Sequence, residues 1–149
     1  MQVVCDTGPL VAAANRRDRA HGLAAALVTE VGRDLLVPLP VAVEVDQLLR
    51  ARVSGDSARA FLESLVAGDH TVVFMSLTVL RRAVELDAGF AELDLGLADS
   101  SVMAIAARED LPILTFDFED FRAAPPDRGY WRLVVDEARY RDAVGPDPS

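Results

Sequence analysis

Five short runs along the chain are rich in apolar residues and lack the alternation of polar and apolar positions that marks a half-exposed strand. Longer stretches with helical spacing separate these runs. Because continuous apolar strands that alternate with helices are typical of a parallel sheet covered on both faces, the pattern predicts an α/β protein. The expected strands are residues 3–5, 35–37, 71–75, 113–116 and 133–135.

The stretches between these strands repeat their apolar residues with the period of an amphipathic helix. Asp56 and Ser76 precede two of them, and side-chain oxygens at such positions accept hydrogen bonds from the free amides of a helix N-terminus. The expected helices are residues 10–14, 18–31, 41–52, 57–67, 77–90 and 98–109, with a short turn near 118–122.

Length and composition limit what kind of protein this can be. A chain of 149 residues, 51% of them hydrophobic, suits one globular domain, which we expect over residues 1–136, followed by a polar tail at 137–149 whose end is frayed. No apolar run approaches the roughly 20 residues of a membrane helix, and no secretory signal precedes the first strand. The single cysteine, Cys5, requires no oxidising compartment, so we expect a cytoplasmic protein.

The chain is acidic, which bears on its partners. It has 24 Asp and Glu residues against 15 positive residues, all of them Arg, and a net charge of −9. This balance argues against a nucleic-acid partner unless cations offset it locally. The positions of the acids therefore matter more than their number.

Two of the acids directly follow expected strands. Asp6 comes after the first strand, where Gly8 turns the chain towards a helix, and Asp117 comes after the fourth. Ligands of open parallel sheets collect at the carboxyl ends of the strands, so we expect both carboxylates at one edge. Thr7 and Thr115 lie beside these acids and can orient them or hold a water, although both are equally explained as structural residues at strand ends.

Two further acids lie on apolar helix faces. Glu44 borders the apolar stripe of its helix beside Leu48, and Asp99 shares a face with Val102 and Met103. A buried, unpaired carboxylate costs several kcal/mol or acquires a raised pKa. The chain has no lysine that could neutralise either acid.

Each acid alone has an ordinary explanation: Asp6 and Asp117 can form turns, Asp99 can cap its helix, and Glu44 can pair with an arginine. Four carboxylates at one sheet edge, however, cannot all stay ionised without a cation. Magnesium or manganese, hard divalent ions that prefer oxygen ligands, match such a site.

The segments around these acids resemble the fingerprint of the PIN-domain family, and specifically the VapC toxins of bacterial VapBC toxin-antitoxin pairs. The resemblance extends from Gln2 to about Val135. It is carried by VVCDTGPL around Asp6, VAVEV around Glu44, LGLADSSVMAIAA around Asp99 and ILTFDFEDF around Asp117.

The resemblance implies a PIN-like α/β/α sandwich around a central, mainly parallel five-stranded sheet. It also implies a homodimer, an RNA substrate and inhibition by a cognate VapB-like antitoxin whose tail covers the active site. Glu119 and Asp120 lie where some members have an additional acid, and we assign both to the surface or to helix capping. The implied catalytic and magnesium-binding carboxylates are Asp6, Glu44, Asp99 and Asp117.

The function implied by the resemblance is that of a magnesium-dependent endoribonuclease toxin, which cleaves a structured RNA such as a tRNA or rRNA loop and so blocks translation. Metal-assisted hydrolysis, in which one ion activates a water and a second stabilises the leaving oxygen, needs no side-chain nucleophile. In agreement, Cys5 falls inside an expected strand, and His21 and His70 lack the spacing of a relay.

Residues outside the acid set suggest two surfaces. Arg16, Arg17 and Arg19 follow the Asp6 loop and are candidate RNA contacts, although a solvated helix face explains them as well. The first helices also carry more apolar residues than one face against a sheet needs, which suggests a dimer surface, although core packing accounts for many of them. These residues are Leu10, Val11, Leu23, Leu27, Val28 and Val31.

Other protein classes share parts of this pattern. Asp-Thr-Gly also occurs in aspartic proteases, but those are all-β. Magnesium-dependent phosphatases of the haloacid-dehalogenase type and receiver domains also place an aspartate at a strand end, but both typically use a lysine, and the phosphatases have an acid where this chain has Gly8. A catalytically silent PIN-type binding module in a regulatory complex stays open as an alternative.

Overall fold

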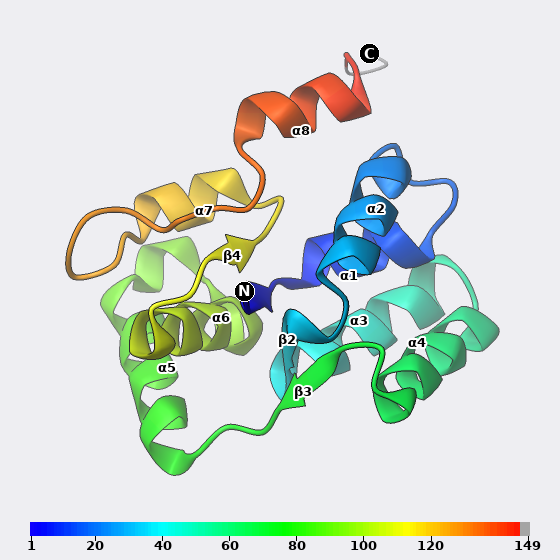
Figure 1. Ribbon diagram of the computed structural model, residues 1–149. Helices are drawn as coiled ribbons and strands as arrows, with labels where there is room; N and C mark the ends of the chain where they lie inside the picture. Colours follow the sequence, from blue (N-terminus) through cyan, green and yellow to red (C-terminus); the bar gives the residue numbers. More distant parts are fainter. Residues whose placement is uncertain (147–149) are drawn as a thin grey trace.

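A four-stranded parallel sheet lies in the middle of the molecule, with helices arranged around it (Figure 1). The computed structural model describes residues 1–146. Neighbouring strands follow the order β3-β2-β1-β4, and the two middle strands are wholly buried, which explains why their sequences are apolar throughout. The strands are β1 (Val3–Cys5), β2 (Leu35–Pro38), β3 (Thr71–Val73) and β4 (Ile113–Leu114).

The helices begin and end close to the expected positions, and α3 and α6 pack directly on the sheet. Ser76 caps α5 as expected, but α4 is capped by Ser54, which accepts a hydrogen bond from the Ser57 amide at 3.0 Å, and not by Asp56. The helices of the described residues are α1 (Thr7–Ala14), α2 (His21–Val31), α3 (Leu39–Arg52), α4 (Gly55–Ala67), α5 (Leu77–Gly89), α6 (Gly96–Glu109), α7 (Phe118–Ala123) and α8 (Glu137–Val144), with 3-10 turns at Gly32–Asp34 and Ala91–Leu93.

The sheet has four strands in the described residues, and not the five that were expected. Leu133 makes a single parallel bridge to Ile113, and the Val134 amide donates to the Ile113 carbonyl at 2.9 Å. Pairing ends there because the chain turns into α8, whose first amides are capped by Asp136: its Oδ1 accepts a hydrogen bond from the Arg139 amide at 2.8 Å. The α/β class with a parallel sheet is confirmed, and the fifth strand is reduced to one bridge.

The C-terminal segment that we assigned to a polar tail contains a regular helix, α8. None of its residues is fully buried, as its polar composition suggests. The frayed end was expected at the last residues, and residues 147–149 lie outside the described part of the chain. In the part that is described, no helix combines the length and the apolar character needed to cross a membrane.

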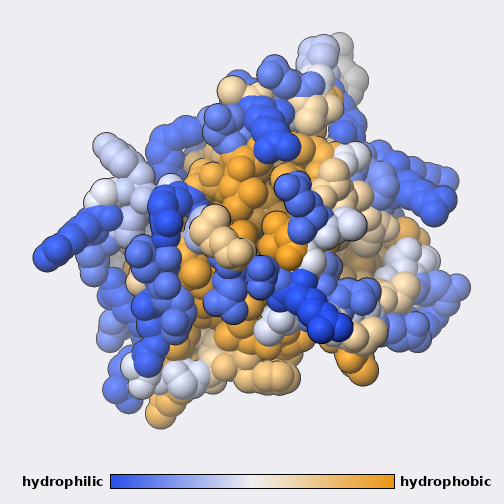
Figure 2. All heavy atoms as spheres, viewed as in Figure 1, coloured by the Kyte–Doolittle hydropathy of each residue, from blue (hydrophilic) through white to orange (hydrophobic). Residues whose placement is uncertain are grey.

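The apolar residues of the first helices belong to the core and do not form an exposed dimer surface. Leu10, Val11, Leu27 and Val28 are buried, and Leu23 and Val31 pack against the core. Apolar side chains gather at the centre of the face in Figure 2, inside a rim of hydrophilic ones. Large exposed apolar side chains also lie at or near the starts of α3, α5 and α6, namely Leu39, Val43, Phe74, Leu77 and Leu97.

Candidate metal centre

Asp6 and Thr115 meet at the carboxyl ends of two neighbouring strands. Because β1 and β4 are parallel and paired, the residues that follow them lie side by side, and the Asp6 amide donates to the Leu114 carbonyl at 2.9 Å. The Thr115 hydroxyl, which is fully buried, donates to Oδ2 of Asp6 at 2.7 Å. The strand-end acid expected from the sequence is therefore fixed by a strand-end threonine.

Among residues 1–146, the carboxylate of Asp6 has no positive partner, although the residue is almost completely buried, with 3% of its surface exposed. Within the described residues, its Oδ1 atom has no hydrogen-bond partner. Burial raises the pKa of Asp6, the Thr115 hydroxyl opposes this, and the charge of Asp117 raises the pKa further. An inward-facing carboxylate oxygen without a donor is the arrangement that a bound cation would satisfy.

The hydroxyl of Thr115 also makes a hydrogen bond with Asp117 and so holds it near Asp6. The Asp117 amide donates to the Thr115 hydroxyl oxygen at 3.0 Å, so one hydroxyl connects the two strand-end acids. Its Oδ1 atom accepts a hydrogen bond from the Asp120 amide at 3.1 Å and caps α7. Burial and the neighbouring Asp117 carboxylate raise the pKa of Asp120.

Asp99 reaches the same place from the first turn of α6. The face that it shares with Val102 and Met103 is the buried one, as its sequence indicates, because both neighbours are fully buried. Burial, which is the largest cause, and the charges of Asp6, Asp117 and Glu44 together raise the pKa of Asp99 to about 9. One carboxylate oxygen of Asp99 lies within 4.8 Å of an oxygen of Asp117 and of one of Asp120.

Glu44 approaches from α3 and is half-buried. Its Oε2 atom accepts a hydrogen bond at 3.0 Å from the hydroxyl of Thr7, the first residue of α1. Its charge is the smallest of those that raise the pKa of Asp99. Thr7 therefore orients Glu44 in the way that Thr115 orients Asp6.

The four acids singled out in the sequence thus come from four elements and converge at one edge of the sheet. Asp117 also caps α7, a structural role that the sequence analysis had not given it. The Asp6 side chain does not cap α1, Asp99 lies inside α6 and not at its cap, and Glu44 makes no ion pair with an arginine in the described residues.

Asp120 lies closer to the other acids than its assignment from the sequence implied. We assigned it, with Glu119, to the surface or to capping, but it is half-buried and contributes to the three-carboxylate cluster, whereas Glu119 is exposed. The signal was its position three residues after Asp117, which places both on one side of the first turn of α7.

The donor set fits a hard divalent cation. All the converging side chains offer carboxylate oxygens, which Mg²⁺ and Mn²⁺ prefer. The unpartnered Oδ1 atom of Asp6 and the high pKa of Asp99 both report a surplus of negative charge that a divalent ion would relieve.

The other side chains that could act as a nucleophile or a proton relay are one cysteine and two histidines, and each makes a contact with the backbone. The Cys5 thiol is buried and donates to the Asp6 carbonyl at 3.3 Å, and burial raises its pKa well above the usual range. The His21 and His70 rings each contact a backbone carbonyl, at 2.9 and 2.8 Å. These contacts agree with the expectation that none of the three is a nucleophile or a relay.

The candidate RNA-binding arginines lie in the turn beyond α1. Arg16 and Arg17 are exposed there, and α1 carries them roughly 12 Å from Asp6, at 1.5 Å per residue. The Arg19 guanidinium instead contacts the carbonyl of Pro146. Only the first two are therefore available to a ligand without rearrangement.

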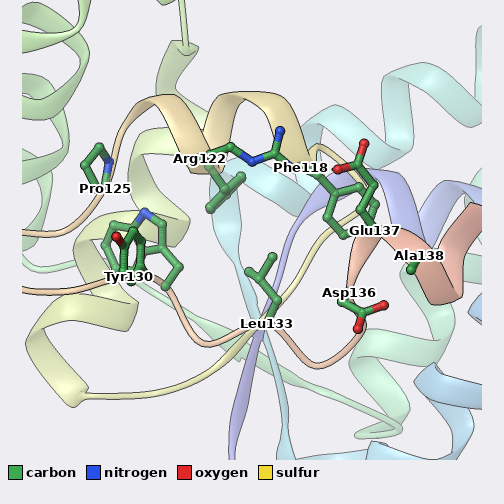
Figure 3. A pocket seen from close by; sticks show the side chains of 10 residues that line it. Phe118, Arg122, Pro125, Tyr130, Leu133, Asp136, Glu137 and Ala138 are labelled. Atoms are coloured by element: carbon green, nitrogen blue, oxygen red, sulfur yellow. Dashed lines mark hydrogen bonds and ion pairs between the residues drawn. The ribbon is translucent and has the colours of Figure 1, made fainter.

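A cavity of about 410 Å³ lies between α7 and the segment that leads into α8 (Figure 3). Its apolar wall includes Phe118, Phe121 and Trp131. Arg122 of α7 and Glu137 of α8 face each other beside it, and their side chains form an ion pair at 2.6 Å. None of the converging acids lines this cavity.

Comparisons with known proteins agree with this architecture. The sequence model of the PIN domain matches residues 3–125. No curated protein matches the chain closely enough to count as a relative.

Solved structures with a similar fold include the Mycobacterium tuberculosis toxin VapC20, described as cleaving the sarcin-ricin loop, with a TM-score of 0.74, 20% identity and coverage of 89% of this chain and 98% of that chain. VapBC from Salmonella typhimurium bound to DNA has a TM-score of 0.64 and 13% identity over 89% and 96% of the two chains. A toxin-antitoxin complex from Klebsiella pneumoniae has a TM-score of 0.60 and 20% identity over 83% and 93%. At these identities the likeness concerns the fold.

Proposed function

We propose, from the premise that this chain belongs to the PIN-domain family, that it is a metal-dependent endoribonuclease and the toxin of a toxin-antitoxin pair. The observation that carries the proposal is the convergence of Asp99, Asp117 and Asp120 near the buried carboxylate of Asp6, whose Oδ1 atom has no hydrogen-bond partner in the described residues. The raised pKa of Asp99, about 9, and the buried Oδ1 atom of Asp6 support a site that holds a cation, because perturbed carboxylates of this kind gather at functional sites.

In this proposal the chain's own residues hold and orient the ligands. Asp6, Asp99, Asp117 and Glu44 are the catalytic and metal-binding carboxylates, and Asp120 joins them. Thr115 and Thr7 are the supporting residues, because their hydroxyls fix Asp6 and Glu44. A divalent ion, Mg²⁺ or Mn²⁺, would supply an acidified water and offset the negative charge of the scissile phosphate.

The proposed substrate is a structured RNA, such as a tRNA or rRNA loop, and cleavage would block translation. The VapC20 toxin, which shares the fold, is described as cleaving the sarcin-ricin loop, an RNA loop. Arg16 and Arg17 are exposed on the α1 side of the acids and are the proposed phosphate contacts, with Arg19 recruited only if its contact with Pro146 opens. We propose a cytoplasmic location as well, because structured RNAs of the translation machinery are found there.

The proposed partner is a VapB-like antitoxin. Two of the similar structures are VapBC complexes bound to DNA, from Rickettsia felis and Salmonella typhimurium. The net charge of −9 favours a segment rich in arginine or lysine as the part that contacts this chain.

We also propose a homodimer. Its surface would use the exposed apolar side chains near the starts of α3, α5 and α6, among them Phe74 and Leu77, which are 76% and 69% exposed, because the first helices are committed to the core. Sedimentation that finds only monomer at micromolar concentrations would remove this part of the proposal.

The test is a cleavage assay on total RNA with the purified chain. Wild type is incubated with Mg²⁺ or with EDTA, and new RNA ends are mapped by sequencing. We expect discrete ends in one or a few structured RNAs with Mg²⁺, loss of these ends with EDTA, and loss in the Asp6→Asn variant. A folded wild type that binds Mn²⁺ but creates no ends would instead support the catalytically silent binding module.

A further inference from the structure

Helix α8 contacts the loop that carries Asp117. The Tyr140 ring of α8 packs in a tilted arrangement against Phe116, with ring centres 4.6 Å apart, and against Phe118, with ring centres 5.5 Å apart. These two phenylalanines are the residues immediately before and after Asp117. The backbone that presents the Asp117 carboxylate is therefore held on both sides by one aromatic ring from a distant part of the chain.

The same ring also packs against the start of the chain. Tyr140 and Val144 contact a small apolar cluster formed by Ala12 of α1 with Ala20 and Ala24. Helix α1 begins directly after Asp6, so its position determines where the Asp6 loop lies. Tyr140 thus lies between the helix that follows Asp6 and the loop that carries Asp117.

An ion pair ties α7 to α8 at a second point. Arg122 near the end of α7 contacts Glu137 at 2.6 Å (Figure 3). Glu137 also accepts a hydrogen bond from Arg141 at 2.7 Å. Arg122 and Arg141 lower the pKa of Glu137, so it stays ionised. Because exposed ion pairs of this kind stabilise little, the aromatic contacts carry most of the connection between the two helices.

Helix α7 needs such support because it is short. It has six residues, well below the length at which a helix is stable by itself in water. Its first turn nevertheless carries Asp120, and its cap is Asp117. Phe118 and Phe121 anchor one side of α7 in the core. Metal ligands must be held within about 0.5 Å of their working positions, so a further contact that fixes the start of α7 matters for the site.

We infer that α8 is a positioning element for the acid cluster and that Tyr140 is its positioning residue, holding Asp117 and Asp120 in place relative to Asp6 and Asp99. The inference rests on the proposed function only in taking these acids as metal ligands. The family model ends at residue 125, so α8 lies beyond the matched segment. The contact acts through the ring, because the Tyr140 hydroxyl makes no hydrogen bond within residues 1–146.

The experiment compares Tyr140→Ala with Tyr140→Phe and uses Tyr130→Ala as the matched control. Tyr130 is 89% exposed and is the other tyrosine of the chain. The first measurement is hydrogen exchange at the Asp120 and Ala124 amides, which report the cap and the last turn of α7, against the Val53 amide at the end of α3. The second is the dissociation constant for Mn²⁺, measured by titration without RNA.

We expect Tyr140→Ala to speed exchange at the α7 amides roughly tenfold while the Val53 amide changes little. It should also weaken Mn²⁺ binding by a factor of roughly three to ten. Tyr140→Phe and Tyr130→Ala should match wild type in both measurements, because each variant keeps an aromatic ring at position 140, in contact with Phe116.

Two results would overturn the inference: unchanged α7 exchange in Tyr140→Ala, or equal acceleration throughout the chain, which would mean that α8 only adds general stability. Tyr140→Phe behaving like Tyr140→Ala would also contradict it. A wild type that binds no Mn²⁺ would refute the proposed function, and the exchange data would still decide whether α8 fixes α7.

Discussion

The hydroxyl of Thr115 connects two acids at once: it donates to Oδ2 of Asp6 at 2.7 Å and accepts from the Asp117 amide at 3.0 Å. One side chain therefore fixes both the carboxylate after β1 and the backbone that presents the carboxylate after β4. Because the hydroxyl is fully buried, water cannot replace either contact.

Thr115→Val should destabilise the protein and weaken its metal site. Valine has nearly the same shape, so the change removes two hydrogen bonds without creating a cavity, and each buried group left unpaired costs about 1–3 kcal/mol. Urea unfolding of the metal-free protein gives the loss of stability, and Mn²⁺ titration gives the loss of affinity.

Two variants serve as controls for Thr115→Val. Thr115→Ser keeps the hydroxyl and should restore most of both properties, while Thr29→Val, at an exposed position, should change neither. If Thr115→Val bound Mn²⁺ as tightly as wild type, the threonine would have no part in orienting Asp6.

Asp99→Asn should stabilise the metal-free protein while it abolishes tight metal binding. The pKa of Asp99 is raised to about 9 by burial and by the charges of Asp6 and Asp117, so an ionised carboxylate there is unfavourable at neutral pH. A neutral amide of similar shape removes this cost. We expect a rise in Tm of about 2–4 °C in EDTA, corresponding to about 1 kcal/mol.

Calorimetry in EDTA and in Mg²⁺ checks this prediction, with Glu109→Gln, an exposed acid on the same helix, as the control. Wild type should gain stability on addition of Mg²⁺, and Asp99→Asn should gain little. A variant that is less stable than wild type in EDTA would show that the Asp99 carboxylate contributes to the fold.

The stability of the metal-free protein should fall as the pH rises. Asp99 has a pKa of about 9 when folded and about 3.9 when unfolded, so between these values the folded state holds a proton that the unfolded state releases. The free energy of unfolding therefore decreases from about pH 4 to about pH 9 as far as this group is concerned. Bound metal displaces that proton, so stabilisation by metal should grow over the same interval.

Thermal melts at about pH 5.5 and about pH 8.5, in EDTA and in Mg²⁺, test whether stability changes with pH in this direction. The Mg²⁺-induced rise in Tm should be larger at the higher pH. The difference between wild type and Asp99→Asn gives the contribution of Asp99 together with its coupling to Asp6 and Asp117, because the titrating groups outside the site are common to both. A Mg²⁺ effect that is equal at both pH values would contradict the assignment of Asp99 as a proton-releasing ligand.

The sequence predicts those parts of the site that follow from local periodicity and strand order. Asp6 and Asp117 follow apolar strands, and Asp99 shares a face with Met103, so their convergence could be expected once the sheet was taken as parallel. Their neighbours Thr7 and Thr115 could be expected as well, because they are adjacent in sequence.

Other features depend on packing between distant segments, which no local pattern encodes. Tyr140 and Phe116 are in contact although they are far apart in sequence. Leu133 begins an apolar run like the other strands, but the cap formed by Asp136 ends its pairing. Ser54, and not Asp56, caps α4, because the choice between two nearby caps depends on where the chain bends.

The place of Asp120 beside the other acids is another feature that the local sequence does not reveal. An acid in the first turn of a helix is favourable in any protein, so its position alone does not reveal a ligand. Asp120→Asn should weaken Mn²⁺ binding roughly tenfold, because a negatively charged oxygen within 4.8 Å of oxygens of Asp99 and Asp117 is replaced by a neutral amide.

Glu119→Gln is the matched control, since Glu119 precedes Asp120 in the same turn and is exposed. Both substitutions remove one negative charge from the first turn of α7, so they should cost the helix a similar amount of stability through its dipole. Only Asp120→Asn should change the Mn²⁺ dissociation constant and the yield of cleaved RNA. Equal effects of the two variants on Mn²⁺ binding would return Asp120 to an ordinary helix-terminal role and reduce the ligand set to Asp6, Glu44, Asp99 and Asp117.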